Sequence, residues 1–320
     1  MRVALMIEPQ QGLTYDEQLA VARHAEAAGF EALFRSDHYE SFPGDAGNHT
    51  TDAWTVIAGL ARDVPRIGLG VLVSPVTYRL PGNLAKVVLT ADEMSGARVE
   101  LGMGAGWHDD EHRRHGFPFP EIGERADMLE EALAIVHGLW EEPDGWSFSG
   151  KHWTIEDSLF RPKPSSLPGR NGGRPNIITG GQGSPRAYRI AARWADEFNL
   201  SSTSPDDAPK KYAALDETLR AAGRDPSSLT HSAMAGVLIG RDREEIGRRE
   251  RDLLAAFGGA DEESETWMAD RRPRWIYGTP DEARDVVKRF EAAGVERIML
   301  QDFIARDLDM IDLAGEILIG

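Results

Sequence analysis

The chain has 320 residues, of which 53 are acidic and 36 are basic, giving a formal net charge of −17 at pH 7. A charge of this sign repels nucleic acid and anionic membrane surfaces, so we expect neither as a partner. The absence of cysteine excludes disulfides, thiolate metal ligands and a cysteine nucleophile. Because neither a signal peptide nor a bilayer-spanning apolar run is found, we expect a soluble, cytoplasmic protein.

Apolar, strand-like runs alternate with segments of helical period from one end of the chain to the other. In chain order, the predicted strands lie at 3–8, 32–37, 67–74, 98–106, 176–181, 195–201, 233–240 and 296–303. The predicted helices lie at 15–28, 54–62, 83–94, 125–140, 186–194 and 207–222, in a charged segment after 240, and at 281–293 and 308–318.

Eight strand–helix units predict a single (β/α)8 barrel, or TIM barrel, that covers residues 1–320 as one domain. The strands are apolar runs, which is typical of parallel strands with helices outside and side chains filling the barrel. An open doubly wound sheet is the alternative that repeated βα units allow. Two stretches, 106–123 and 142–174, do not fit the repeat and are predicted to be insertions, the second a Gly-, Pro- and Ser-rich loop.

The active site of such a barrel lies at the C-terminal ends of its strands, which are polar and glycine-rich in this chain. Asp37 and His38 form the sharpest pair among these strand ends. The histidine can exchange a proton beside a reacting carbon, and the carboxylate can hold a ring or a backbone amide in place. The alternative interpretation is a helix-capping aspartate followed by a surface histidine.

Two glycine turns predict contacts with a bound ligand. The segment GMGAGW (102–107) follows a strand, and its small residues let the backbone approach a phosphate or a flat ring. The segment TGGQGSPRA (179–187) places a glycine turn, a helix N-terminus and Arg186 at one point, which predicts a phosphate site. Residues 158–193 contain no acid and seven basic side chains, so they form either a pocket for an anion or a solvated basic face.

Three histidines, His108, His112 and His115, have the spacing of metal ligands on a helix, with acidic residues among them. This pattern raises a zinc-dependent hydrolase as a rival function. A row of polar residues is more typical of a solvated helix, and we therefore predict no metal site.

Several of these segments resemble one known family. They are SDHY (36–39), LGVLVSPVTYRLPGNLAK (69–86), and above all the long segment 91–133 from ADEMSGARVELGMGAGW to ERADMLEEAL. They resemble the bacterial-luciferase-like family and, within it, the branch that uses the deazaflavin coenzyme F420. Residues 148–164 and 178–199 extend the resemblance, whereas beyond 199 only the general pattern of 278–300 matches.

The resemblance implies a luciferase-like (β/α)8 barrel, usually a homodimer, with the cofactor ring across the C-terminal mouth. In it, Asp37 matches a residue that contacts the ring, and His38 matches a histidine near the reacting carbon. Val71 and Leu72 fall where such enzymes often have a non-prolyl cis peptide behind the ring, and Ser74 matches a hydrogen-bonding position beside it.

The same resemblance assigns the remaining cofactor contacts. Ala105 and Gly106 fall near the cofactor chain, and the phosphate is implied at Gly180, Gly181, Ser184 and Arg186. Trp107, which we also expect to border the cofactor, stands where the sugar-phosphate dehydrogenases of this branch carry a glutamate. This departure argues against a glucose-6-phosphate dehydrogenase and for a more apolar substrate.

The function implied is a coenzyme F420-dependent oxidoreductase that transfers a hydride between the deazaflavin C5 and a small-molecule substrate. One alternative is a monooxygenase on the same fold that uses reduced FMN. A second alternative is a flavin-binding protein without catalytic activity, which the intact Asp37–His38 pair disfavours.

Overall fold

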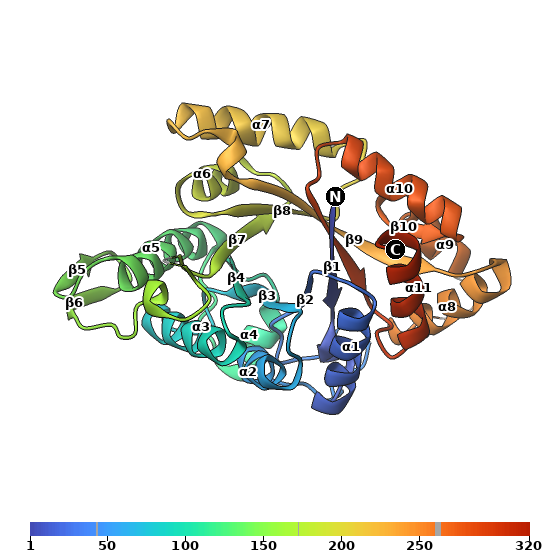
Figure 1. Ribbon diagram of the computed structural model, residues 1–320, viewed down its shortest axis with the longest axis horizontal. Helices are drawn as coiled ribbons and strands as arrows, with labels where there is room; N and C mark the ends of the chain where they lie inside the picture. Colours follow the sequence, from blue (N-terminus) through green and yellow to red (C-terminus); the bar gives the residue numbers. More distant parts are fainter. Residues whose placement is uncertain (43, 172, 260–263) are drawn as a thin grey trace.

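The computed structural model describes residues 1–42, 44–171, 173–259 and 264–320. Within them, eight parallel strands close into a ring, which confirms the (β/α)8 barrel and excludes the open sheet (Figure 1). Pairing of the last strand with the first closes the ring. In order around it the strands are β1 (Arg2–Ile7), β2 (Ala32–Arg35), β3 (Gly68–Pro75), β4 (Val99–Gly104), β7 (Asn176–Gly181), β8 (Glu197–Ser201), β9 (Thr230–Ile239) and β11 (Arg297–Asp302).

Helices cover the outside of the ring and begin and end at residues that the sequence marks clearly. Thr14 and Glu17 form a capping box at the start of the first helix, and Gly96 ends the third with a φ of 73°. No helix among the described residues combines the length and apolarity needed to cross a bilayer. The helices of the repeat are α1 (Tyr15–Ala27), α2 (Ala53–Asp63), α3 (Pro81–Ser95), α5 (Ile122–Glu141), α6 (Pro185–Trp194), α7 (Ala208–Ala221), α8 (Arg243–Ala256), α10 (Pro280–Ala292) and α11 (Leu308–Leu318).

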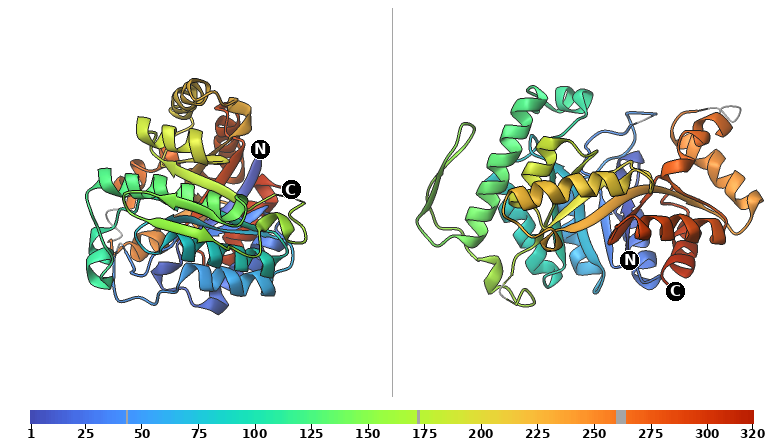
Figure 2. Two further views of the ribbon diagram at one scale, coloured as in Figure 1. Left: turned by 90° about the vertical axis from the view of Figure 1, so that its left-hand side faces the viewer. Right: turned by 90° about the horizontal axis from the view of Figure 1, so that it is seen from above.

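The stretch 142–174, predicted to be a loop, contains an antiparallel hairpin of β5 (Trp146–Ser149) and β6 (Thr154–Ser158). The loop prediction was wrong. Prolines and glycines dominate the stretch, and the alternation of half-buried and exposed residues in β5 is too short to show as a strand in the sequence. The ring of Trp146 packs against α5 at Gly138, where an added Cβ would lie 2.1 Å from the indole. Figure 2 shows the hairpin projecting beyond α5, outside the barrel.

Three further short elements were not predicted. They are α4 (Asp109–His115), which lies within the first insertion, α9 (Ser264–Ala269) and the strand β10 (Ile276–Gly278), which pairs with the C-terminal half of β9. Helices α8 and α9 lie at the opposite end of the molecule from the hairpin (Figures 1 and 2).

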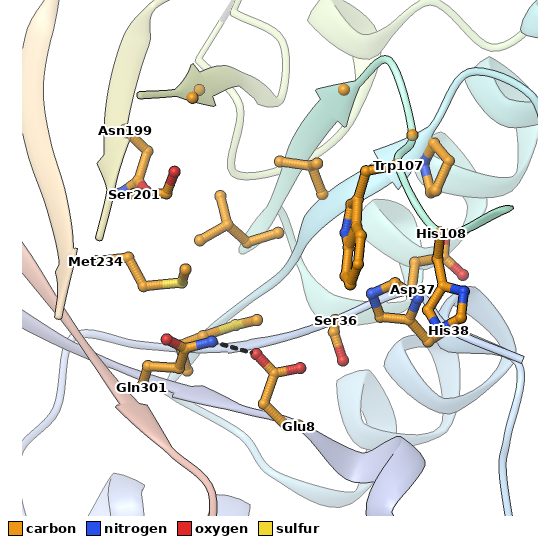
Figure 3. A pocket seen from close by; sticks show the side chains of 18 of the residues that line it. Glu8, Ser36, Asp37, His38, Trp107, His108, Asn199, Ser201, Met234 and Gln301 are labelled. Carbon is orange, nitrogen blue, oxygen red and sulfur yellow. Dashed lines mark hydrogen bonds between the residues drawn. The ribbon is translucent and has the colours of Figure 1, made fainter. Parts of the chain in front are cut away.

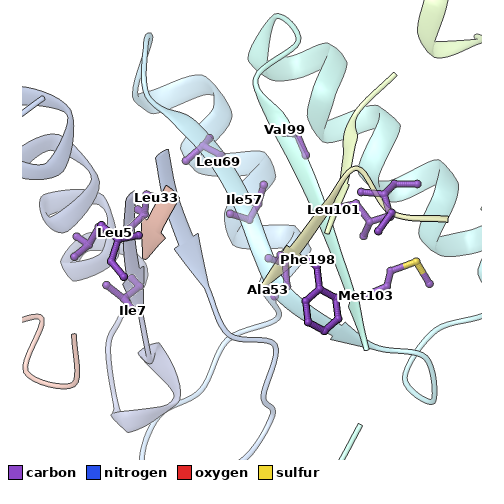
Figure 4. Close-up of a cluster of buried hydrophobic side chains, with 14 of the residues drawn as sticks. Leu5, Ile7, Leu33, Ala53, Ile57, Leu69, Val99, Leu101, Met103 and Phe198 are labelled. Atoms are coloured by element: carbon purple, nitrogen blue, oxygen red, sulfur yellow. The ribbon is translucent and has the colours of Figure 1, made fainter. Parts of the chain in front are cut away.

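The strands are buried on both faces. Outward-facing residues such as Leu5, Leu33 and Leu101 pack against the helices and form the main core (Figure 4). Inward-facing residues such as Met6 and Phe34 fill the barrel itself. This double burial explains why the strands are continuous apolar runs in the sequence.

Charged residues close the N-terminal end of the barrel, at the start of the strands. Arg297, at the first position of β11, pairs with Glu100 at 2.8 Å, with Glu197 at 2.5 Å and with Glu31 at 2.9 Å. Burial raises the pKa of Glu197 to about 7, although Arg297 opposes this rise. Arg297 and the three carboxylates at this end of the barrel therefore each have an ion-pair partner within the protein.

Candidate active site

The C-terminal ends of the strands surround a cavity of about 840 Å³. Its wall comes from residues at the ends of all eight barrel strands and from the loops that follow them. Figure 3 shows His38 and Trp107 on one side, Asn199, Ser201 and Met234 on the other, and the hydrogen-bonded pair of Gln301 and Glu8 between them. This is the place where a (β/α)8 barrel carries its active site.

His38 lies in the cavity wall directly after β2 and is held by a buried carboxylate from a distant segment. Its Nδ1 lies 2.8 Å from Oε2 of Glu111, which belongs to α4 and is fully buried. Burial alone would raise the pKa of Glu111, but hydrogen bonds from His38 and from the Tyr39 amide lower it below its ordinary value. An ionised Glu111 accepts the Nδ1 proton, so neutral His38 carries its lone pair on Nε2.

No side chain among the described residues hydrogen-bonds Nε2 of His38. The ring is bordered by Phe42, with 4.5 Å between ring centroids, and by Trp107, with 5.8 Å. Its side chain is 12% exposed, so the ring is nearly desolvated but still reachable from the cavity. The arrangement can hold or release one proton at Nε2.

Asp37 also lies in the wall, but its carboxylate serves a different purpose. Both of its oxygens accept hydrogen bonds from Arg79, whose guanidinium also pairs with Asp52 and donates to the hydroxyl of Tyr39 at 2.8 Å. The Asp37 side chain is 1% exposed. A carboxylate held in this way is a counter-ion that fixes the loop after β2, and the contact of Asp37 with a cofactor ring and its part in catalysis stay predictions.

Glycines and small residues form much of the wall beside His38. Gly104 ends β4 and Ala105 and Gly106 follow it, while Gly180 and Gly181 end β7. Of these, Ala105, Gly106, Gly180 and Gly181 are the residues for which cofactor contacts are predicted. Gly106 has a φ of 77°, a conformation that side chains disfavour, which explains the glycine at this turn. These segments expose backbone to the cavity, where a flat ring can approach closely.

The third strand contributes to the wall one residue later than predicted. The non-prolyl cis peptide bond joins Leu72 and Val73, and both side chains line the cavity. Val71 faces outward into the main core, and the buried hydroxyl of Ser74 accepts a hydrogen bond from the Trp54 indole at 2.9 Å. The side chains of Val71 and Ser74 therefore do not face the cavity, because a shift in strand register between them interrupts the regular alternation and leaves Leu72 and Val73 both facing inward.

The predicted phosphate residues separate into two groups. Gly180 and Gly181 lie in the wall, whereas Ser184 caps its own helix α6 and accepts from the Ala187 amide at 3.2 Å. Arg186 pairs with Asp127 of α5 and donates to the Gly123 carbonyl at 3.0 Å.

Other cations of the acid-free stretch are neutralised as well, by carboxylates from other parts of the chain. Arg161 pairs with Asp144, Arg170 with the buried Asp92, and Arg174 with both Glu141 and Asp196. These pairs favour the basic-face interpretation for most of the stretch, because the acids that balance its cations are close in space and distant in sequence.

The three histidines of 108–115 do not converge. His108 caps α4, His112 is buried with its Nε2 2.7 Å from the Thr77 hydroxyl, and His115 stacks on Phe117. Among the described residues, no group of three His, Asp or Glu side chains is arranged to hold a metal ion.

Polar groups at the ends of the first and last barrel strands also line the cavity, as their positions in the sequence predict. Glu8 accepts hydrogen bonds from Gln301 and, at 2.9 Å, from Gln10. The hydroxyl of Tyr78 is buried, and burial together with the nearby carboxylate of Glu111 raises its pKa. The sequence contains no local signal for Tyr78, because the packing of distant segments brings it to the cavity.

The comparisons with known proteins agree with this geometry. Residues 1–300 match the family model described as luciferase-like monooxygenase. The chain therefore belongs to the luciferase-like family, as the resemblance predicted.

Individual relatives differ in the reaction that their names give. The chain is 27% identical over 267 residues to "Pyrimidine monooxygenase RutA" of Stutzerimonas stutzeri, covering 82% of this chain and 71% of the relative. It is 32% identical over 203 residues to "F420-dependent glucose-6-phosphate dehydrogenase" of Microbacterium testaceum, covering 62% of this chain and only 57% of that relative. A solved F420-dependent secondary alcohol dehydrogenase has the same fold, with a TM-score of 0.83, 20% identity, and coverage of 99% of this chain and 98% of that one.

Proposed function

We propose that this protein is a coenzyme F420-dependent oxidoreductase that transfers a hydride between the deazaflavin C5 and a small organic substrate. The observation that carries the proposal is His38, which has one nitrogen fixed by Glu111 and the other free in the cavity. Relatives named as F420-dependent dehydrogenases support the choice of cofactor.

The cavity fits a flat, extended cofactor. The side chains of Leu72 and Val73 offer an apolar surface, and the glycine segments 104–106 and 180–181 leave room for close approach. For the phosphate we propose the backbone at Gly180 and Gly181 and the start of α6, with Ser184 and Arg186 beside it.

The deazaflavin supplies a carbon that carries two electrons as a hydride, and the protein supplies the proton chemistry. With neutral His38, Nε2 takes the hydroxyl proton of an alcohol substrate as the alcohol is oxidised. In the reverse direction the imidazolium returns that proton to the carbonyl oxygen. Glu111 stabilises the imidazolium and fixes the ring orientation throughout.

Aromatic side chains restrict water at the reacting centre. Phe42 and Trp107 lie edge to face, with 5.1 Å between ring centroids, next to His38. Trp107 is 65% exposed at the mouth, so a bound ligand is expected to cover it. Covering this surface would dry the site and strengthen the contacts of His38 with the substrate oxygen.

A monooxygenase using reduced FMN is the second candidate, and the similarity to a pyrimidine monooxygenase over 82% of the chain favours it. The two candidates share the ring site and differ in the oxidant. We also infer a homodimer from the family resemblance, which light scattering of the purified protein would test.

A binding titration of the purified protein with F420 and with FMN separates the candidates. We expect micromolar or tighter binding of F420 and at least about tenfold weaker binding of FMN, a difference of about 1.4 kcal/mol. Equal affinities, or tighter binding of FMN, would favour the monooxygenase. Binding of neither cofactor would contradict both.

A further inference from the structure

A second pocket, of about 430 Å³, opens beside the main cavity. The two share the wall formed by Ser202, Met234, Phe257, Gln301 and Phe303. The part that belongs to the second pocket alone is formed by Gly236 of β9 and by residues 270, 271, 274 and 275, which follow α9. A ligand can therefore extend from one pocket into the other.

Two arginines, Arg271 and Arg274, line this pocket. Neither forms an ion pair with a carboxylate in the part of the chain that the structure describes. Arg271 donates to the Trp267 carbonyl at 2.8 Å, and Arg274 donates to the Asp270 carbonyl at 3.1 Å. Each guanidinium has five N–H groups, so most of their donors stay available for a ligand.

The two charges lie near each other in a pocket of a strongly acidic protein. The protein has a net charge of −17, and arginines elsewhere, such as Arg170, Arg249 and Arg297, are held by carboxylates. Asp270 also lines the pocket and its charge acts to raise the pKa of Arg271, but the two form no ion pair within 4.0 Å. Desolvation and the nearby charge of Arg274 both lower the pKa of Arg271. An anion between the two guanidiniums would relieve this repulsion.

Arg271 is held in position for such a contact. Its guanidinium lies over the ring of Trp267, with 3.5 Å between the central carbon and the ring centroid. Stacking of this kind restricts a side chain that is otherwise flexible, and so lowers the entropy that a ligand must overcome on binding.

The remaining wall is aromatic. Trp275 stacks on Phe303, with 5.7 Å between centroids and 11° between the ring planes, and Phe257 meets Phe303 edge to face. Gly236 provides the space for Trp275, since an added Cβ would lie 2.1 Å from the indole. The pocket thus combines an apolar wall with two cationic groups at one end.

We propose that this pocket binds the anionic end of the substrate, which has an apolar or aromatic body and a terminal carboxylate or phosphate. The inference rests on the proposed function, because the reacting carbon of the same molecule would lie in the main cavity near His38. The pocket lies at β9, β11 and the segment that precedes β10, whereas the glycine turns proposed for the cofactor lie at the ends of β4 and β7 on another part of the ring. We therefore assign the anion to the substrate and not to the tail of the cofactor.

The test uses the full-length protein without cofactor and two matched probes, 3-phenylpropionate and its uncharged amide. Binding is measured by calorimetry for the wild type, Arg271→Gln, Arg274→Gln and the double variant. Arg251→Gln serves as the control, because Arg251 is an exposed residue of α8 without a carboxylate partner in the described part of the chain. Thermal unfolding verifies that each variant is folded, and Arg271→Lys keeps the charge if Gln disturbs the stacking on Trp267.

We expect the carboxylate to bind more tightly than the amide, and the double variant to lose about tenfold or more in affinity for the carboxylate alone. Affinity for the amide and for the cofactor should stay unchanged, as should every affinity of Arg251→Gln. Equal binding of the carboxylate by wild type and double variant would overturn the inference. A matching loss of cofactor affinity in the variants would also overturn it, because the pocket would then hold the cofactor tail. If neither F420 nor FMN binds while the loss of carboxylate affinity persists, the proposed function fails and the anion site stands.

Discussion

The two ends of the barrel use charge in opposite ways. At the N-terminal end, Arg297 is surrounded by three carboxylates, so each of these charged groups has a partner within the protein. At the C-terminal end, Nε2 of His38 has no hydrogen-bond partner and the guanidiniums of Arg271 and Arg274 have no carboxylate partner among the described residues, and all three side chains line cavities. Groups satisfied within the protein contribute to folding, whereas groups left unsatisfied are available to a ligand. The difference separates the stabilising end of the barrel from the functional end.

The largest effect that this comparison predicts is at His38. The variant His38→Ala should lower turnover by about 10²- to 10⁴-fold, because a positioned proton donor or acceptor is lost, while cofactor affinity stays nearly unchanged. Steady-state kinetics together with a binding titration would measure both. His24→Ala, on the exposed face of α1, is the control and should have no effect. Full turnover in His38→Ala would remove this residue from the mechanism.

The opposite end should respond in stability and not in chemistry. Arg297→Met leaves Glu100 and Glu197 buried without their cation, so the free energy of unfolding should fall by about 3–5 kcal/mol. Denaturant unfolding measures this loss, and cofactor affinity below the transition should be retained. Arg306→Gln removes an exposed pair with Glu17 and should cost less than about 1 kcal/mol. Similar losses in the two variants would contradict the contrast between the ends.

Glu111 tests whether a buried charge at the functional end acts through His38. Glu111→Gln should lower turnover by about 10- to 100-fold, because the amide cannot stabilise the imidazolium, and it should change the pH profile of turnover. Asp110→Asn, one residue earlier and exposed, is the matched control. If Glu111→Gln changed only the unfolding temperature, Glu111 would have a structural role alone.

The smallest expected effect concerns Asp302, a fully buried carboxyl at the C-terminal end of β11 whose Oδ2 has no partner in the structure. Burial raises its pKa from 3.8 to about 7. Between about pH 4 and pH 7 the folded state therefore keeps a proton that the unfolded state has lost, and this contribution to stability disappears as the pH rises.

Asp302→Asn, which is neutral at every pH, should reduce the loss of stability between pH 5 and pH 8 by about 1–2 kcal/mol. Denaturant unfolding at both pH values measures the change. Glu197 also has a raised pKa, so it too makes the protein less stable as the pH rises. Because Glu197 is present in both proteins, its contribution cancels when their stabilities are compared. An identical pH dependence in wild type and variant would show that Asp302 is ionised in the folded protein.

Local patterns in the sequence determined the barrel and part of the site. Because the barrel strands are buried on both faces, each one is a continuous apolar run in the sequence, and these runs predicted all eight strands. The position of His38 after β2 and the glycine turns after β4 and β7 also follow from short segments, because the end of a parallel strand is visible in the sequence. The hairpin at 146–158 was missed, since its few alternating residues lie among prolines and glycines.

Only the tertiary structure decided which charged groups are free. Glu111 is 73 positions from His38, and the acids that neutralise Arg170 and Arg186 are 78 and 59 positions from them. No local pattern predicts these pairs, because ring closure brings distant strand ends together. The same closure left Arg271 and Arg274 beside an aromatic pocket without a counter-ion among the described residues. The sequence by itself determined where a site could form, and the packing of distant segments decided which of its side chains can bind or react.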